Sequence, residues 1–194
     1  MKFIKPMLAS RGNVSDLERK RYIFEPMHDG VRVIVYKYKS SLKIFDSVGK
    51  NITRLFPELL SLSKYVDVKE CVLDCEIVIY SKGRPDFQKL KERFLLKRKE
   101  IAKISKDIPA VLVVKDILYK NGKNLRNLSL MKRKEVLENT VAETNLSEVV
   151  FYSDHGKKLW KQMLEKGFRG VIAKYKSGKY VSGKTVSSWL CVGL

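Results

Sequence analysis

The sequence predicts a mixed α+β fold of largely antiparallel sheets flanked by helices. Runs rich in β-branched and aromatic residues alternate irregularly with amphipathic segments, which disfavours the regular strand–helix alternation of a doubly wound parallel fold. The 194 residues are 44% hydrophobic, enough for a sizeable core in one domain over residues 1–194. No apolar run is long enough for a membrane span, and the N-terminus lacks the apolar core of a signal peptide.

Strands are expected where β-rich runs occur, and helices where apolar residues recur every three to four positions. The expected strands are 22–26, 31–38, 42–45, 72–80, 110–119, 170–175 and 187–192. The expected helices are 52–62, one after an N-cap at Asp86 that continues through the charged residues 97–106 into solvent, 129–139 and 157–166. The Asp29-Gly30 turn predicts either an ordinary hairpin or a close approach of backbone to a ligand.

The charge of the chain is strongly positive. Forty Lys and Arg residues against 21 Asp and Glu residues give a formal charge of +19. Such an excess favours a polyanionic partner such as DNA or RNA, although lysine-rich surfaces also serve solubility. Three cysteines (Cys71, Cys75 and Cys191), an odd number without finger-like spacing, fit a reducing cytoplasm.

Two carboxylates interrupt an apolar strand. Period two places Asp74 and Glu76 on one face of the expected strand 72–80 and apolar residues on the other. Carboxylates in such a place indicate either structural salt bridges or a functional site. Arg32, shortly after Gly30, has the planar guanidinium that could bind a phosphate with two parallel hydrogen bonds.

Five segments in order resemble the five motifs of the covalent nucleotidyltransferase superfamily. They are FEPMHDGVR (24–32), LDCEI (73–77), AVLVVKDIL (110–118), FRGVIAK (168–174) and SSWLCVG (187–193). The stretches KPMLA (5–9) and SGKYVSGK (177–184) are similar to prokaryotic ATP-dependent DNA ligases, including those of the end-joining type. The resemblance covers nearly the whole chain. It implies an ATP-grasp-like nucleotidyltransferase fold, an adenylation domain, without the oligonucleotide-binding domain that normally follows.

The resemblance also implies a reaction. In this family a lysine attacks the α-phosphate of ATP, with Mg²⁺, and the AMP passes to the 5′-phosphate of a nicked DNA duplex during DNA repair. Met27 stands at the position of that lysine. The family pattern implies nucleotide contacts by Glu25, Asp29, Gly30, Arg32, Glu76 and Lys174, with Glu76 also a candidate metal ligand.

Several other motif positions depart from the family pattern. The resemblance leads us to expect an aromatic residue at Lys115, a metal-binding glutamate at Arg169, and phosphate-binding lysines at Cys191 and Gly193. It also implies an arginine at Ser47 and a glycine at Cys75. Because a thioether cannot form the phosphoramide bond, we expect self-adenylation to be absent or strongly impaired and ATP binding to be weakened.

Two other functions remain open alongside an impaired DNA ligase domain. One is a non-catalytic nucleic-acid-binding module that uses the basic surface. The other is a soft-metal or thiol site formed by Met27, His28, Cys75 and Cys191, for which the alternative is simple space filling. For each we expect a cytoplasmic monomer of prokaryotic type that does not associate with membranes.

Overall fold

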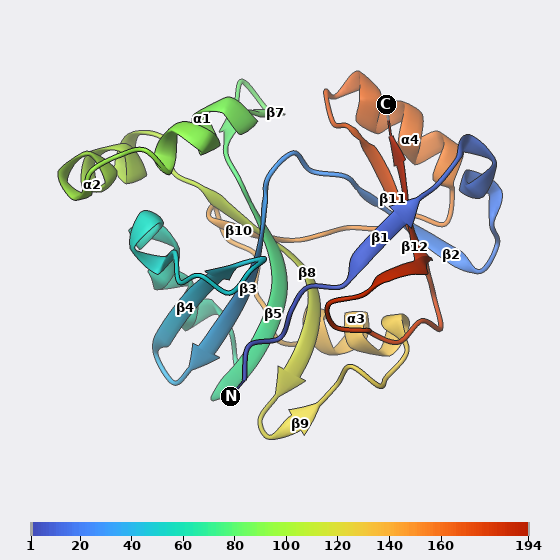
Figure 1. Ribbon diagram of the computed structural model, residues 1–194, viewed down its shortest axis with the longest axis horizontal. Coiled ribbons are helices and arrows are strands. Elements are labelled where there is room, and N and C mark those ends of the chain that lie inside the picture. Colours follow the sequence, from blue (N-terminus) through green and yellow to red (C-terminus); the bar gives the residue numbers. More distant parts are fainter. Residues whose placement is uncertain (1, 194) are drawn as a thin grey trace.

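The computed structural model describes residues 2–193 and contains two β-sheets that lie side by side with helices on their outer faces (Figure 1). Sheet A has the strand order β1-β12-β11-β2. Its strands are β1 (Leu8–Arg11), β2 (Tyr22–Pro26), β11 (Gly170–Tyr175) and β12 (Thr185–Gly193). β11 runs antiparallel to both of its neighbours, whereas β1 pairs with β12 in parallel.

Sheet B has the order β10-β8-β5-β3-β4, with a short strand β9 paired to β8. Its strands are β3 (Val31–Tyr38), β4 (Ser41–Asp46), β5 (Glu70–Val78), β8 (Val111–Lys120), β9 (Lys123–Asn124) and β10 (Ser147–Val149). A separate two-stranded ribbon is formed by β6 (Tyr80–Ser81) and β7 (Arg84–Pro85). The expected α+β class with mainly antiparallel pairing is confirmed, and the parallel exceptions are β1 with β12 and β10 with β8.

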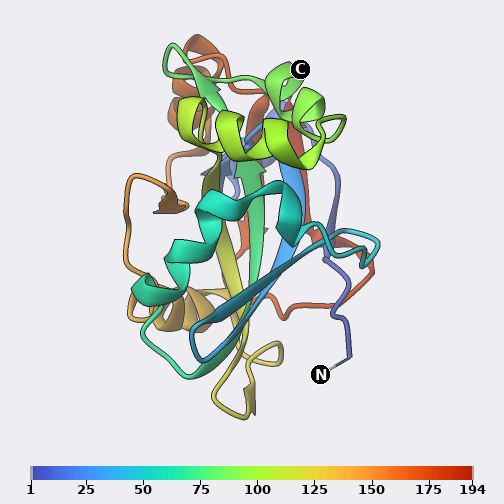
Figure 2. The same ribbon diagram turned by 90° about the vertical axis from the view of Figure 1, so that its left-hand side faces the viewer.

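Helices flank both sheets, and α3 (Leu130–Glu138) lies below them, where its side chains reach residues of both sheets (Figures 1 and 2). The other helices are α1 (Phe87–Arg93), α2 (Arg98–Asp107), α4 (Gly156–Glu165) and the 3₁₀ segments η1 (Val14–Glu18), η2 (Thr53–Leu55) and η3 (Pro57–Tyr65). On sheet A, Leu159 and Met163 of α4 pack against Phe24 and Val171. Within residues 2–193, none of the helices has the length and apolar character needed to cross a membrane.

A larger core lies between sheet B and the elements outside it. It unites odd-numbered residues of β3 and β5, such as Val33 and Leu73, with Phe56 and Leu59 of the 3₁₀ region and Ile101 of α2. Period-two alternation therefore turns the even-numbered residues of the same strands towards sheet A. These inward-facing side chains form the candidate site.

Three expectations about elements are wrong. The expected helix 52–62 is two 3₁₀ segments, because Phe56 adopts a non-helical conformation (φ −133°, ψ 60°) and Pro57 has no N–H to continue the ladder. Residues 97–106 do not extend α1 into solvent. They form the separate helix α2, because Ile101 is buried in the apolar core outside sheet B. The Asp29-Gly30 turn does not close a hairpin, since β2 and β3 belong to different sheets.

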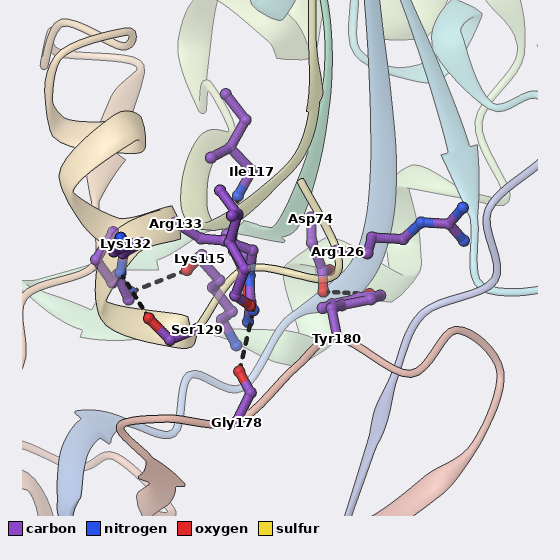
Figure 3. A network of polar contacts seen from close by, with 12 residues as sticks. Asp74, Lys115, Ile117, Arg126, Ser129, Lys132, Arg133, Gly178 and Tyr180 are labelled. Atoms are coloured by element: carbon purple, nitrogen blue, oxygen red, sulfur yellow. Dashed lines mark hydrogen bonds and ion pairs between the residues drawn. The ribbon is translucent and has the colours of Figure 1, made fainter. Parts of the chain in front are cut away.

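A buried arginine joins α3 to the segment before β12. Arg133 makes two hydrogen bonds of 2.9 Å to the carboxylate of Asp116 on β8, and both side chains are fully buried. It also donates to the carbonyl of Gly178 at 3.1 Å, a contact drawn in Figure 3. A buried ion pair of this kind fixes the position of α3 relative to β8. Breaking the pair would leave an unpaired charge in the low-dielectric interior.

Arg133→Met is therefore expected to lower the free energy of unfolding by about 3–5 kcal/mol, because Asp116 remains buried and unpaired. Urea denaturation followed by circular dichroism measures this loss. The matched control is Arg133→Met with Asp116→Leu, which removes both charges and should recover most of the stability. Equal losses in the single and double variants would contradict the assignment.

Candidate functional site

Met27 lies where the end of β2 meets β11 and β12. Its backbone N–H donates to the carbonyl of Gly170 at 3.0 Å. A Cβ atom built on Gly193 would come within 2.6 Å of the Met27 Cε atom and 2.6 Å of the Arg169 carbonyl oxygen. The structure therefore brings Met27, Arg169 and Gly193 together, and the thioether occupies the space that a larger residue at Gly193 would need.

Glu25, beside Met27 on β2, is fully buried between two lysines. Its Oε1 atom lies 2.6 Å from Nζ of Lys134 on α3, and its Oε2 atom lies 2.6 Å from Nζ of Lys174 on β11. Both contacts are ion pairs whose angles fall outside hydrogen-bond geometry. Lys134 also donates to the carbonyl of Lys115 at 2.9 Å, so its side chain links the two sheets.

The charged side chains of this cluster shift one another's pKa values. Burial alone would raise the pKa of Glu25, but the ammonium groups of Lys134 and Lys174 outweigh it and lower the pKa to about 2. Burial lowers the pKa of Lys174 to about 8, against the opposing attraction of Glu25. Lys174 also lies over the ring of Trp189, with Nζ 4.1 Å from the centroid.

A second buried ion pair lies across the gap on sheet B. The Nζ atom of Lys115 on β8 contacts Oε2 of Glu76 on β5. The other carboxylate oxygen of Glu76 accepts a hydrogen bond of 3.1 Å from the N–H of Gly30. Burial would raise the pKa of Glu76, but Lys115 lowers it below the usual value. Gly30 fits because an added Cβ would lie 2.4 Å from the Ile77 carbonyl oxygen.

Arg32 is also held by an internal partner. It forms a two-point contact with Asp74, each N–O distance being 2.5 Å, and Asp74 accepts a third hydrogen bond of 2.7 Å from the Tyr180 hydroxyl (Figure 3). Burial would lower the pKa of Arg32, but Asp74 raises it above the usual value. The sequence left open whether Asp74 and Glu76 form structural salt bridges or a functional site. In the structure, each of these two carboxylates forms a salt bridge.

The rim of the site carries weaker contacts. Arg169, whose side chain is 62% exposed, lies 3.4 Å from Asp29. His28 is buried with Nε2 3.3 Å from Glu148, which also accepts a hydrogen bond of 2.9 Å from the Tyr80 hydroxyl. The expected position of a metal-binding carboxylate therefore holds an exposed cation. Ser47 lies in the exposed turn after β4.

The cysteines do not support a soft-metal cluster. Cys75 packs in the core on the opposite face of β5 from Glu76, and burial raises its pKa well above the usual value. Cys191 is half-buried on β12, and burial raises its pKa as well. Among residues 2–193 no group of three or more His, Cys, Asp or Glu side chains could hold a metal ion. The expected convergence of Cys75 with Met27, His28 and Cys191 is therefore wrong.

Sequence reasoning missed several residues of the site. Lys134 and Glu148, which contact Glu25 and His28, lie outside the quoted segments, and Tyr180, which contacts Asp74, lies in the quoted stretch 177–184 but was given no role. One signal was available for Lys134: it follows Leu130 by four positions, on the helix face that is buried.

Comparisons with known proteins agree with the fold and with the motif order. The sequence profile of the ATP-dependent DNA ligase domain matches residues 6–192, so the chain belongs to that family. The solved structure of mycobacterial DNA ligase D complexed with ATP and MES superimposes with a TM-score of 0.82 at 26% identity, over 98% of this chain and 60% of that one. The nucleotidyltransferase fold expected from the motifs is thereby confirmed.

Two curated relatives illustrate how much of a longer protein this chain matches. The multifunctional non-homologous end joining DNA repair protein LigD of Mycobacterium tuberculosis is 27% identical over 188 residues, which is 96% of this chain and 23% of that protein. The SPbeta prophage-derived DNA ligase-like protein LigB of Bacillus subtilis is 30% identical over 193 residues, which is 98% of this chain and 67% of that protein. This chain therefore spans under a quarter of LigD.

The lowered pKa of Glu25 predicts an acid-dependent loss of stability. The carboxyl group titrates near 4.5 in the unfolded chain and near 2 when folded, so its contribution is complete above pH 4.5 and is lost as the pH falls towards 2. The wild type should lose about 3 kcal/mol more than Glu25→Gln over this interval. Urea unfolding at a series of pH values measures both proteins. Parallel pH profiles would contradict the charged pairing.

Proposed function

We propose that this chain is a ligase-type adenylation domain that does not attach AMP to itself and that acts by binding DNA. The observation that carries the proposal is the thioether of Met27 at the nucleophile position, beside a carboxylate whose charge two lysines already neutralise. A thioether has no transferable proton and no nitrogen for a phosphoramide bond. Covalent catalysis at this position therefore lacks its nucleophile.

Another amine would have to replace the missing lysine. Lys174 is the strongest candidate, because its pKa of about 8 makes the free amine more accessible than that of an ordinary lysine. However, its Nζ atom is 2.6 Å from Glu25 and lies against Trp189, so an attack on phosphorus would first require both contacts to break. In-line displacement is fast only when the nucleophile is already held close to the phosphorus atom and opposite the leaving group.

The residues present fit ATP and Mg²⁺ poorly. The resemblance implies adenine stacking at Lys115, but this side chain is an ammonium paired with Glu76, and stacking worth about 1–3 kcal/mol is lost. Glu76, the candidate metal ligand, already contacts Lys115 and the Gly30 N–H. Arg169 places a positive charge where the family pattern has a carboxylate. We infer weakened nucleotide binding.

DNA binding does not require these lost residues. The formal charge of +19 favours a phosphate backbone, and the family is one of DNA ligases. The lysines inside the site already pair with carboxylates of the protein. The lysines and arginines that can bind DNA phosphates are therefore the exposed ones. We infer that nicked duplex DNA, the family's substrate, binds to a monomer of this chain in the cytoplasm without ATP.

Incubation with ATP and Mg²⁺ should leave the intact mass of the wild-type protein unchanged, because no residue of the site forms a phosphoramide. Mass spectrometry of the whole chain checks this, with an active ATP-dependent DNA ligase as the positive control. An added AMP on the wild type would overturn the proposal. Met27→Lys alone should also remain unmodified, since Lys115, Arg169, Cys191 and Gly193 still depart from the family pattern.

Binding to nicked duplex DNA without ATP should be measurable at low salt and should weaken as salt rises. The logarithm of the association constant should fall linearly with the logarithm of the salt concentration, by about 0.9 per phosphate neutralised. Fluorescence anisotropy of a labelled duplex measures the slope. A chain with its lysines acetylated serves as the control. An absence of binding at low salt would refute the DNA-binding part of the proposal.

A further inference from the structure

A cavity of about 570 Å³ opens on the inward face of sheet B, and its lining shares no residue with the cluster around Met27 and Glu25. Its walls are mainly aromatic. The rings come from the N-terminal segment, β3, β4 and β8: Phe3, Tyr36, Tyr38, Phe45 and Tyr119. We call this cavity the aromatic groove. Its volume lies in the range of small-molecule and cofactor sites.

Strand register explains why these rings gather. Tyr36 of β3 lies opposite Lys43 of β4 on one side and Val72 of β5 on the other. Val72 in turn pairs with Tyr119 of β8. One row of inward side chains therefore crosses four adjacent strands. Cross-strand neighbours in such a row contact one another, and here the buried Val72 lies between the half-buried rings of Tyr36 and Tyr119 to form one platform.

One ring of the groove is exposed, and the other four are half-buried and held by packing. Tyr38 is 54% exposed. Phe45 packs edge-on against Tyr36 at a centroid distance of 5.4 Å and in a tilted arrangement against Phe3 at 6.1 Å. The Tyr36 hydroxyl accepts a hydrogen bond of 2.8 Å from the Ile4 N–H, which fixes the N-terminal segment at the groove. Preorganised rings lose little side-chain entropy when a ligand stacks on them.

The charge around the aromatic groove is positive. Lys43 lines it and is exposed, and Lys39 is exposed with its Nζ 5.6 Å from the Tyr38 ring centroid. Lys37 is different: it is buried and donates to the carbonyls of Lys39 and Val68. Glu70, the acidic lining residue, accepts a hydrogen bond of 3.2 Å from the Tyr119 hydroxyl. The Glu70 carboxylate keeps its negative charge, so the positive balance at this edge comes from the two exposed lysines, Lys39 and Lys43, against one carboxylate.

We propose that the aromatic groove binds the bases of a single-stranded nucleic acid, with Lys39 and Lys43 on its phosphates. Aromatic side chains on a sheet stack on bases, and flanking lysines follow the backbone. A paired duplex hides its base faces, so the rings favour an unpaired strand over the duplex bound elsewhere on the chain. The groove is independent of self-adenylation, because its lining residues take no part in the Met27 cluster.

The test compares a labelled thymidine oligomer of about ten nucleotides with an abasic oligomer of the same length, by fluorescence anisotropy on the full chain. Tyr38→Ala should weaken binding of the thymidine oligomer about 5-fold or more, whereas Tyr38→Phe keeps the ring and should bind like the wild type. Binding of the abasic oligomer should be weaker and equal in all three proteins. Tyr65→Ala, an exposed tyrosine of η3 outside the groove, is the matched control and should have no effect.

Three results would overturn the proposal. The first is equal affinity of wild type and Tyr38→Ala for the thymidine oligomer. The second is an equal loss with the abasic oligomer, which would assign Tyr38 to phosphate contact. The third is Tyr38-dependent binding of a glutamate oligomer as tight as that of the thymidine oligomer, which would identify an acidic peptide as the ligand. Nicked-duplex affinity that is unchanged in Tyr38→Ala separates this site from the DNA binding proposed above.

Discussion

The pairing of Glu25 with Lys134 and Lys174 is the interaction on which the rest of the site depends. A fully buried carboxylate is costly unless opposite charge and good geometry compensate for its lost hydration. Here one compensating lysine comes from β11 in the same sheet and the other from α3, which packs on sheet B. The pairs therefore hold the facing sheets together with side chains of the protein itself. Because Glu25 already pairs with both lysines, we propose that these ammonium groups attract a nucleotide phosphate less strongly than free lysines would.

The motif residues that this chain retains have structural partners. Arg32 is bound to Asp74, and Glu76 binds the Gly30 N–H and Lys115. Each of these contacts stabilises the junction between strands whether or not a reaction follows. Retention of the motif framework is consequently compatible with loss of the nucleophile. The aromatic groove proposed as a binding surface shares no lining residue with these ion pairs.

Much of the fold follows from sequence because its signals are local. Period-two patterns located β3, β5 and β8, and Asp86 caps α1 as expected. The separate helix α2 could not be predicted because it depends on tertiary packing, whereas Pro57 is a local signal for the break at Phe56. In the site, the structure brings Met27 and Gly193 together with the backbone of Arg169. Motif spacing could not reveal that Lys115 pairs with Glu76, or that Lys134 reaches Glu25 from a helix outside the motifs, because those contacts join segments distant in sequence.

Internal ion pairs join residues at which the family pattern implies nucleotide contacts, and we propose that these pairs weaken ATP binding. Isothermal titration of the wild-type chain with ATP and Mg²⁺ at neutral pH is the sharpest check. No saturable heat is expected up to millimolar ATP. Saturable binding at micromolar ATP, abolished by Glu25→Gln while the variant stays folded, would show that the nucleotide still binds between the sheets and would refute the proposal.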